Sequence, residues 1–141
     1  MTTTLPPALI AAYQATHYQV FIAGETITLR IGAISSRLFE LHKQHDETCS
    51  GFLTAWNPYS VNVSLGGNCD AQTSLLEKLG QLKLALLPGL GIDPAGSVPG
   101  EESVLALGLT SEEAISFGNQ YQQNAVVWIG NDAVPELILL K

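Results

Sequence analysis

The chain has 141 residues, 46% of them hydrophobic and 13% charged, so we expect one globular domain spanning residues 1–141 rather than a disordered or multidomain chain. The 6 Lys and Arg residues against 13 Asp and Glu residues give a net charge of −7, which disfavours nucleic acid and anionic lipid surfaces as partners. No apolar run approaches the roughly 20 residues that a membrane span needs, which leaves a small molecule or another protein as the expected partner.

The first third of the chain predicts a helix, a hairpin and a second helix. Two neighbouring prolines suit the first turn of a helix that ends near Thr16. Residues 17–32 hold two β-branched runs of alternating polarity around a glycine turn, which is the pattern of a hairpin. Ser35 or Ser36 can then cap a helix that stops near Thr48.

The middle of the chain predicts two strands separated by a helix. The apolar run CSGFLTAW, residues 49–56, has the composition of a central strand that is buried on both faces. A helix fits residues 68–79, with Gly80 as its left-handed C-terminal residue, and LKLALL follows as a strand. Residues 88–100 are rich in glycine and proline, so we expect one long irregular segment there.

The last third of the chain predicts a strand, a helix and a hairpin. Residues 103–109 form a buried strand, and Thr110 with Glu113 provides a capping box for the next helix. Residues 125–129 and 137–140 then pair as a C-terminal hairpin. The elements together predict an α/β chain of the α+β kind, with a single mixed sheet of about six to seven strands, about four helices covering it and hairpins at both ends.

The stretch FLTAWNPYS ends a predicted strand in a polar aromatic loop. Trp56 and Tyr59 offer flat apolar rings with one donor each, whereas Asn57 and Ser60 offer short polar arms, a mixture typical of a small ligand pocket. The same residues also suit a structural turn, in which Asn57 bonds its own backbone and Trp56 belongs to the core. Residue types alone leave both interpretations open.

Two acids, Glu101 and Glu102, directly precede the strand predicted to start at Ser103. A carboxyl group at the mouth of a strand can act as an acid or base when burial raises its pKa. We expect Glu101 to be solvated and take Glu102 as the candidate catalytic residue. Glu102 reaches the Asn57 end of the sheet only if the two strands run antiparallel.

Other familiar site patterns are incomplete in this sequence. Gly89 and Gly91 lack the third glycine of a dinucleotide fingerprint, and neither a Gly-Lys-Ser/Thr loop nor a Gly-x-Ser-x-Gly elbow occurs. His42, His45 and Cys49 lack a fourth zinc ligand, and His45 falls on the apolar face of its predicted helix. We therefore expect neither a metal nor a cofactor.

The N-terminus and the cysteines indicate the compartment. The first residues lack the basic start and apolar core of a signal peptide, so we expect a cytoplasmic protein. In that compartment Cys49 and Cys69 are expected to stay reduced.

Several blocks of the chain resemble the bacterial family called domain of unknown function 3293. These blocks are AYQATHYQV, RIG, FLTAWNPYS followed by Asn68, EESVLALGL and QQNAVVWI, and the similarity runs from about Leu9 to Val127. The family name carries no activity. The positions that share the family pattern are Tyr13, Tyr18, Trp56 to Pro58, Ser60, Asn68, Glu102, Ser103 and Gln123.

This chain departs from the family pattern in two places. Gln122 stands where such sequences usually show a glycine, and the stretch from Val98 to Gly100 replaces the usual tryptophan before the acidic pair. If that tryptophan lines a site in the family, the site is altered here.

These observations favour a small-molecule-binding domain, with catalysis left open. We expect Trp56 and Tyr59 to stack on the ligand, and Glu102 to serve as acid or base. The residues expected to orient the ligand are Asn57, Ser60 and Asn68, to which the family resemblance adds Gln123. The alternative is a protein-interaction or regulatory module without catalytic activity, and an edge strand of the C-terminal hairpin would also allow a homodimer.

Overall fold

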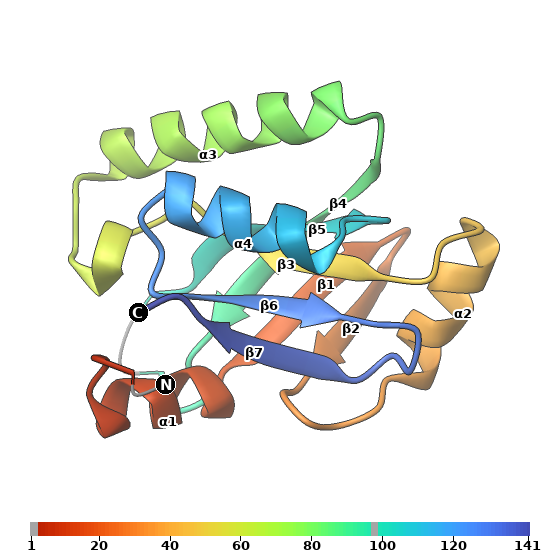
Figure 1. Cartoon of the computed structure of the whole chain (residues 1–141), viewed down its shortest axis with the longest axis horizontal. Coiled ribbons are helices and arrows are strands. Elements are labelled where there is room, and N and C mark those ends of the chain that lie inside the picture. The colour runs from red at the N-terminus through yellow and green to blue at the C-terminus, as the bar shows by residue number, and fades with distance from the viewer. Residues whose placement is uncertain (1–2, 97–98) are drawn as a thin grey trace.

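The computed structural model describes residues 3–96 and 99–141, and the structural statements below concern these residues (Figure 1). The four α-helices are α1 (Pro7–Ala15), α2 (Ser36–Gln44), α3 (Leu65–Gln81) and α4 (Ser111–Gln120), and a short 3-10 helix, η1, spans Pro58–Ser60. The strands are β1 (His17–Ile22), β2 (Glu25–Leu29), β3 (Ser50–Leu53), β4 (Ala85–Ile92), β5 (Glu101–Leu107), β6 (Ala125–Ile129) and β7 (Pro135–Leu139).

The seven strands form one curled sheet in the order β2-β1-β4-β5-β3-β6-β7. This arrangement confirms the predicted fold class, but every described strand pair is antiparallel, so the sheet is not mixed. The reason lies in the two helical crossovers. Helix α3 joins β3 to β4 and α4 joins β5 to β6, and in each case the two joined strands point the same way but are separated by one antiparallel strand.

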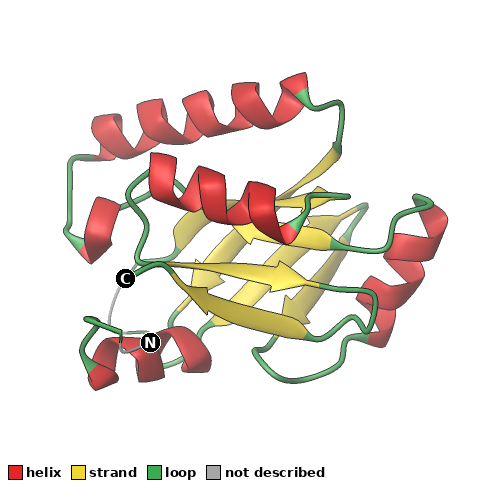
Figure 2. Ribbon diagram, viewed as in Figure 1, coloured by secondary structure: helices red, strands yellow, loops and turns green. Residues whose placement is uncertain are grey.

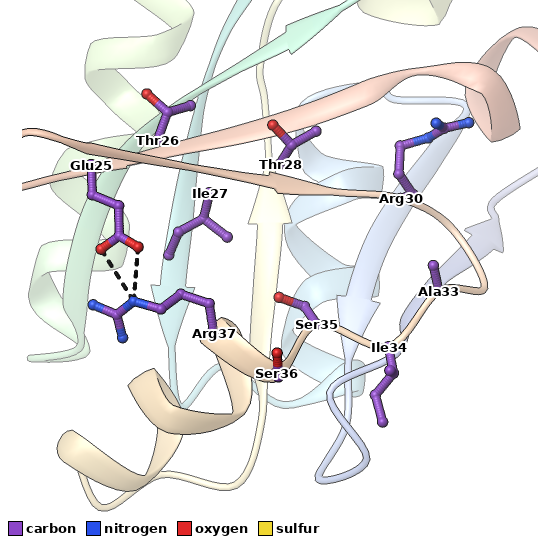
Figure 3. Close-up of a pocket in the computed structure, with 10 residues that line it drawn as sticks. All are labelled: Glu25, Thr26, Ile27, Thr28, Arg30, Ala33, Ile34, Ser35, Ser36 and Arg37. Atoms are coloured by element: carbon purple, nitrogen blue, oxygen red, sulfur yellow. Dashed lines mark hydrogen bonds and ion pairs between the residues drawn. The ribbon is translucent and has the colours of Figure 1, made fainter.

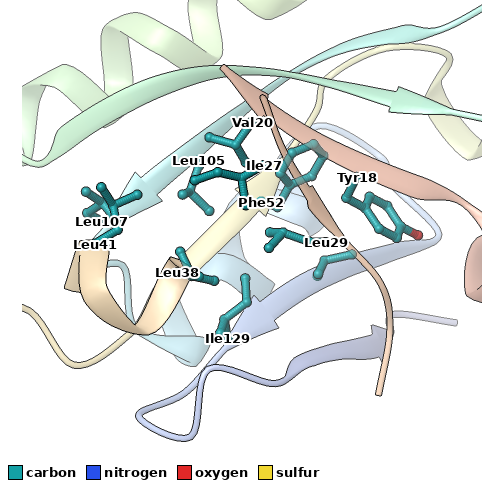
Figure 4. Packing of buried hydrophobic residues seen from close by; sticks show 11 residues of the cluster. Tyr18, Val20, Ile27, Leu29, Leu38, Leu41, Phe52, Leu105, Leu107 and Ile129 are labelled. Carbon is teal, nitrogen blue, oxygen red and sulfur yellow. The ribbon is translucent and has the colours of Figure 1, made fainter. Parts of the chain in front are cut away.

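The inside of the curl holds one apolar cluster, into which α2 inserts Leu38 and Leu41. Tyr18 lies at one end of this cluster, with Leu41 and Leu107 at the other (Figure 4). A second cluster fills the space between the opposite face of the sheet and the helices α3 and α4, which lie together on that side (Figure 2). Burial of these two faces is the main force that stabilises the fold.

Local signals at the helix starts work as the sequence predicts. The Ser35 hydroxyl accepts a hydrogen bond from the Leu38 amide, which starts α2. Thr110 and Glu113 form the reciprocal capping box of α4, with bonds of 3.0 and 3.1 Å. These caps satisfy amides that would otherwise be unpaired.

Several predicted boundaries are wrong. Helix α3 begins at Leu65 rather than 68, because Ser64 caps it, and the left-handed residue after it is Lys83 rather than Gly80. Strand β4 extends through residues 88–92, which were predicted as irregular. Gly89 permits this, because a Cβ there would lie 2.7 Å from the Gln19 carbonyl oxygen.

Three further findings concern the buried face of α2, the stretch before β5 and the length of the helices. Leu38 and Leu41 are buried as predicted, and His42 joins them on the inner face of α2, whereas His45, which was predicted on that face, is exposed and follows the helix as its C-cap. Val98, part of the stretch that replaces the family tryptophan, lies outside the described residues. Within the described ranges, none of the helices has the length and apolar character needed to cross a lipid bilayer.

Candidate functional site

The antiparallel pairing of β3 with β5 brings the candidate residues to one end of the sheet. Leu53, near the end of β3, pairs with Val104, so the loop after β3 meets the start of β5. The two strands are antiparallel, as is required for the acids before Ser103 to reach the Asn57 end of the sheet. Asn68, in the first turns of α3, and Gln123, two residues before β6, both contact this loop.

Asn57 and Asn68 form a reciprocal pair. The backbone nitrogen of Asn57 donates to Asn68 Oδ1 at 2.9 Å, and Asn68 Nδ2 donates to Asn57 Oδ1 at 3.0 Å. Asn57 has a φ of 46°, a left-handed conformation that asparagine tolerates better than most residues. Asn68 is only 3% exposed, so its amide has both partners inside the protein and holds the loop in place.

The carboxyl group that reaches this pair belongs to Glu101. Asn57 Nδ2 donates to Glu101 Oε2 at 2.8 Å, and burial raises the pKa of the Glu101 carboxyl while this hydrogen bond partly offsets the rise. Glu102 has an exposed side chain, and its backbone oxygen accepts a bond from the Thr54 hydroxyl at 2.7 Å. The strand starts two residues earlier than predicted, and side chains alternate between faces, so Glu101 shares the inner face of the curl with Leu105.

Two hydrogen bonds tie the loop to residues 122 and 123, which precede β6. The Tyr59 amide donates to the Gln122 carbonyl, and Gln123 Nε2 donates to the Trp56 carbonyl at 3.1 Å. The Tyr59 ring is 42% exposed, and Lys141 Nζ lies 3.5 Å from its centroid. Tyr59 also has a positive φ of 54°, which is uncommon for a bulky residue. The Ser60 side chain lies outside the described structure.

Two buried donors beside this network have no partner among the described residues. Gln72 is 1% exposed; its Oε1 accepts from the Ala55 amide at 2.9 Å, whereas its Nε2 makes no hydrogen bond. The indole Nε1 of Trp56 is likewise buried and unpaired. Sequence reasoning missed Gln72, although a polar residue four positions after Asn68, on the stripe that continues with Leu75, was the available signal.

Tyr18 lies close to the carboxyl group of Glu101. Its hydroxyl donates to the Tyr13 carbonyl at 2.6 Å. Burial raises the pKa of Tyr18, and the nearby acid adds to that rise. Tyr18 therefore stays neutral and contributes a hydroxyl, not a charge, to the mouth of the curl.

Two surface hollows of the described structure lie away from these residues. One runs along β2 and the start of α2, where Arg37 Nε contacts both carboxylate oxygens of Glu25 at 3.0 and 3.1 Å (Figure 3). The other lies between α1 and β7. The candidate site is thus a half-buried polar cluster at the surface, whose side chains bond largely to one another.

The described residues contain no group of three or more His, Cys, Asp and Glu side chains that could hold a metal ion. Cys49 and Cys69 are free thiols, and burial raises the pKa of Cys49. The Cys49 thiol donates to the Leu109 carbonyl at 3.2 Å. A raised pKa makes this thiol a poor nucleophile.

Comparison with known proteins places the chain in one family. The model of the family described as protein of unknown function (DUF3293) matches residues 53–126, more than half of the 141-residue chain. The chain therefore belongs to the DUF3293 family. The matched range includes the loop after β3, the start of α3 and the acids of β5, and it leaves out α1 and β7. No curated protein and no solved structure matches the chain.

Proposed function

We propose that this chain binds a small polar molecule at the mouth of the curled sheet, beside Trp56, Gln72 and Glu101. The observation that carries the proposal is the Gln72 amide, which is almost completely buried and leaves one donor unpaired. Buried donors in native proteins are nearly always paired, and each exception calls for a partner such as a ligand or an ordered water. The unpaired Trp56 indole, one residue from the backbone amide that Gln72 holds, supports the same conclusion.

The roles within this site follow from the hydrogen bonds. Asn68 and Gln123 hold the loop, and Asn57 positions Glu101, so these three residues act on the ligand through others. The groups left for the ligand are the donors of Trp56 and Gln72, the Glu101 carboxyl and the exposed Tyr59 ring. For Glu102 and Ser60, a contact with the ligand stays a prediction. The ligand is then a molecule with acceptor atoms, such as carbonyl or carboxylate oxygens, and a flat part that stacks.

The raised pKa of Glu101 gives the site one chemical capability. A carboxyl group of this kind keeps its proton at a pH where an ordinary glutamic acid is ionised, so it can donate a hydrogen bond or a proton to a bound acceptor. Proton transfer is therefore the reaction that these residues support, and Asn57 would hold the acid in position during it.

A thermal-shift screen of a metabolite panel tests this proposal. A ligand that binds the native state raises the melting temperature. We expect at least one compound to do so for the wild type and for Glu102→Gln, but not for Glu101→Gln, which has the same change of charge at the neighbouring position. A compound that stabilises Glu101→Gln equally, or a panel in which no compound acts, would contradict the proposal.

A second candidate function is the protein-interaction module, which one observation favours. Four exposed apolar side chains lie within seven residues, starting at Tyr59 of the candidate site: Tyr59, Val61, Val63 and Leu65. Exposed apolar groups this close together are typical of partner-binding surfaces. A protein captured by the wild type and by Glu101→Gln, but lost with Val61→Ser, Val63→Ser and Leu65→Ser combined, would favour this function over the first.

A further inference from the structure

Helix α1 is apolar yet has no buried residue. Seven of its nine residues are alanine, leucine, isoleucine or tyrosine, and none of them is buried. Its first turn follows Leu5, which is buried at 8% exposure. A helix that is apolar around most of its circumference normally packs against a core. Here Ile10 and Gln14 of the helix line a surface hollow. Figure 1 shows α1 next to the sheet edge that β7 forms.

The hollow under α1 lies where the two edges of the curled sheet approach each other. It has a volume of about 370 Å³ and is lined by aliphatic side chains from α1, the end of β2 and the edge strand β7. These side chains are Ile10, Ile31, Val134, Leu137 and Leu139, and each of them is only partly buried. A volume of this order is in the range of small-molecule sites.

Two backbone hydrogen bonds define one end of the hollow. The amides of Gly32 and Ser35 donate to the carbonyls of Pro135 and Ala133, each at 2.9 Å. They tie the loop after β2 to the start of β7, at opposite ends of the strand order. The edges of the sheet are therefore held together by a loop rather than by strand pairing, which leaves room for an aliphatic group.

The rim of the hollow is acidic. Asp132 lines it together with Gln14, and none of its lining residues is lysine or arginine. Glu136 touches the hollow from the edge of β7, but it pairs with Trp128, so its side chain belongs to the opposite face of the sheet from Leu137. Asp132 uses Oδ1 to accept a bond from the Val134 amide at 3.1 Å, so its charge is fixed at the rim. The chain as a whole carries a net charge of −7. An occupant with a negative head group would be repelled, whereas a cationic one would be attracted.

We propose that the hollow between α1 and β7 binds an aliphatic chain that carries an amine. The apolar part lies against Ile10, Ile31 and Leu139, and the ammonium group faces Asp132. This site is separate from the polar cluster at Glu101 and does not depend on its function.

Three six-carbon probes that differ only in their head group test the proposal on the full chain. Hexylamine, hexanol and hexanoate are titrated by calorimetry at concentrations at which none forms micelles. We expect hexylamine to bind most tightly and hexanoate most weakly. One exposed charge pair makes a preference of roughly two- to fivefold for the amine over the alcohol.

Two variants separate the charged rim from the apolar floor. Asp132→Asn should abolish the preference for the amine, whereas Asp70→Asn, an equal change of charge at an exposed position of α3, should retain it. Ile10→Gln, on α1, should weaken the binding of both the amine and the alcohol. Equal binding of hexanoate and hexylamine, no binding of hexylamine, or an unchanged affinity in Ile10→Gln would overturn the proposal.

Discussion

Asn57 and Glu101 lie 44 positions apart in the chain, and Asn57 Nδ2 donates a hydrogen bond of 2.8 Å to Glu101 Oε2. The pairing of β3 with β5 makes this contact possible, because it places the end of one strand beside the start of the other. Burial of the Glu101 carboxyl raises its pKa, and the hydrogen bond from Asn57 partly offsets this rise. Ionisation of Glu101 therefore lowers the free energy of unfolding, and groups with such shifted pKa values are common at functional sites.

The first prediction concerns the stability of Glu101→Gln. Glutamine keeps an acceptor for Asn57 but has no charge to desolvate, so the variant should melt at a higher temperature than the wild type at pH 7. The folded-state pKa of Glu101 lies above its ordinary value of 4.5. Wild-type stability from this group is thus fully present below pH 4.5 and is lost as the pH rises through the folded-state pKa.

Melting curves recorded between pH 4 and pH 8 check this prediction. The advantage of Glu101→Gln should shrink as the pH falls and vanish below the ordinary value of 4.5. Glu102→Gln is the matched control, since the Glu102 side chain is exposed, and it should differ little from the wild type at any pH. A lower melting temperature of Glu101→Gln at pH 7 would show that the carboxylate itself stabilises the fold.

The second prediction is that Asn68 holds the loop. Asn68→Ala removes two hydrogen bonds of Asn57: the acceptor for its backbone amide and one of the two donors to its Oδ1, which keeps only the Val63 amide at 3.3 Å. Leaving such groups unpaired costs about 1–3 kcal/mol. The free energy of unfolding in urea measures this loss. Cys69→Ala, at the exposed neighbouring position, should change it by less than about 0.5 kcal/mol, and an equally small effect of Asn68→Ala would disprove the structural tie.

The third prediction concerns Gln122, which follows α4 with a left-handed backbone. Its φ is 57°, in the left-handed region where a side chain is strained and glycine is not. The side chain is exposed, so little packing is lost when it is removed. Gln122→Gly should therefore raise the free energy of unfolding, by up to about 1 kcal/mol once the flexibility of glycine in the unfolded chain is subtracted.

Gln120→Gly provides the control with the opposite sign. Gln120 ends α4, where glycine is unfavourable by roughly 0.5–1 kcal/mol. Chemical denaturation of the two variants side by side separates the effect of the left-handed backbone from the general effect of glycine. If both variants lose stability, the strain at Gln122 is not real.

The fourth prediction is a loss of stability in acid through His42. His42 is 3% exposed, and its Nε2 lies 2.8 Å from the Ser50 hydroxyl oxygen. Burial lowers its pKa below the ordinary 6.5. The unfolded chain then takes up a proton before the folded one does, so this group destabilises the fold progressively as the pH falls below 6.5.

Replacement of His42 and, separately, of the nearby His45 distinguishes this effect from others. His42→Gln should be less stable at pH 8, because a buried hydrogen bond is disturbed, but its stability should depend less on pH below 6.5. His45→Gln, at an exposed position, should keep the pH dependence of the wild type. Equal slopes for wild type and His42→Gln would rule out His42 as the titrating group.

Local features of this chain could be predicted from its sequence. The caps at Ser35 and Thr110 depend on residues within one helical turn, and the terminal hairpins depend on alternating strands and short turns. The family blocks likewise located the loop at Trp56 and Asn57. Each of these signals lies within a few residues, so it can be recognised without knowledge of the tertiary structure.

Features set by tertiary pairing could not be predicted in the same way. The choice between Glu101 and Glu102 depends on where β5 starts, and an error of one residue moves a side chain to the opposite face of the sheet. The sequence favoured Glu102, and the structure brings Glu101 to Asn57. The part played by Gln72 was missed because its partner, the Ala55 amide, is a backbone group on a distant element.

The indole resonances of the two tryptophans give the most direct test of a ligand site at the mouth of the curl. Trp128 Nε1 already donates to the Leu109 carbonyl at 2.9 Å, whereas Trp56 Nε1 is buried and has no partner among the described residues. In a nitrogen-15 NMR titration with polar compounds, a true ligand should move the Trp56 indole signal strongly and leave that of Trp128 in place. A compound that binds without moving the Trp56 signal, or that moves both signals alike, would contradict the proposed site.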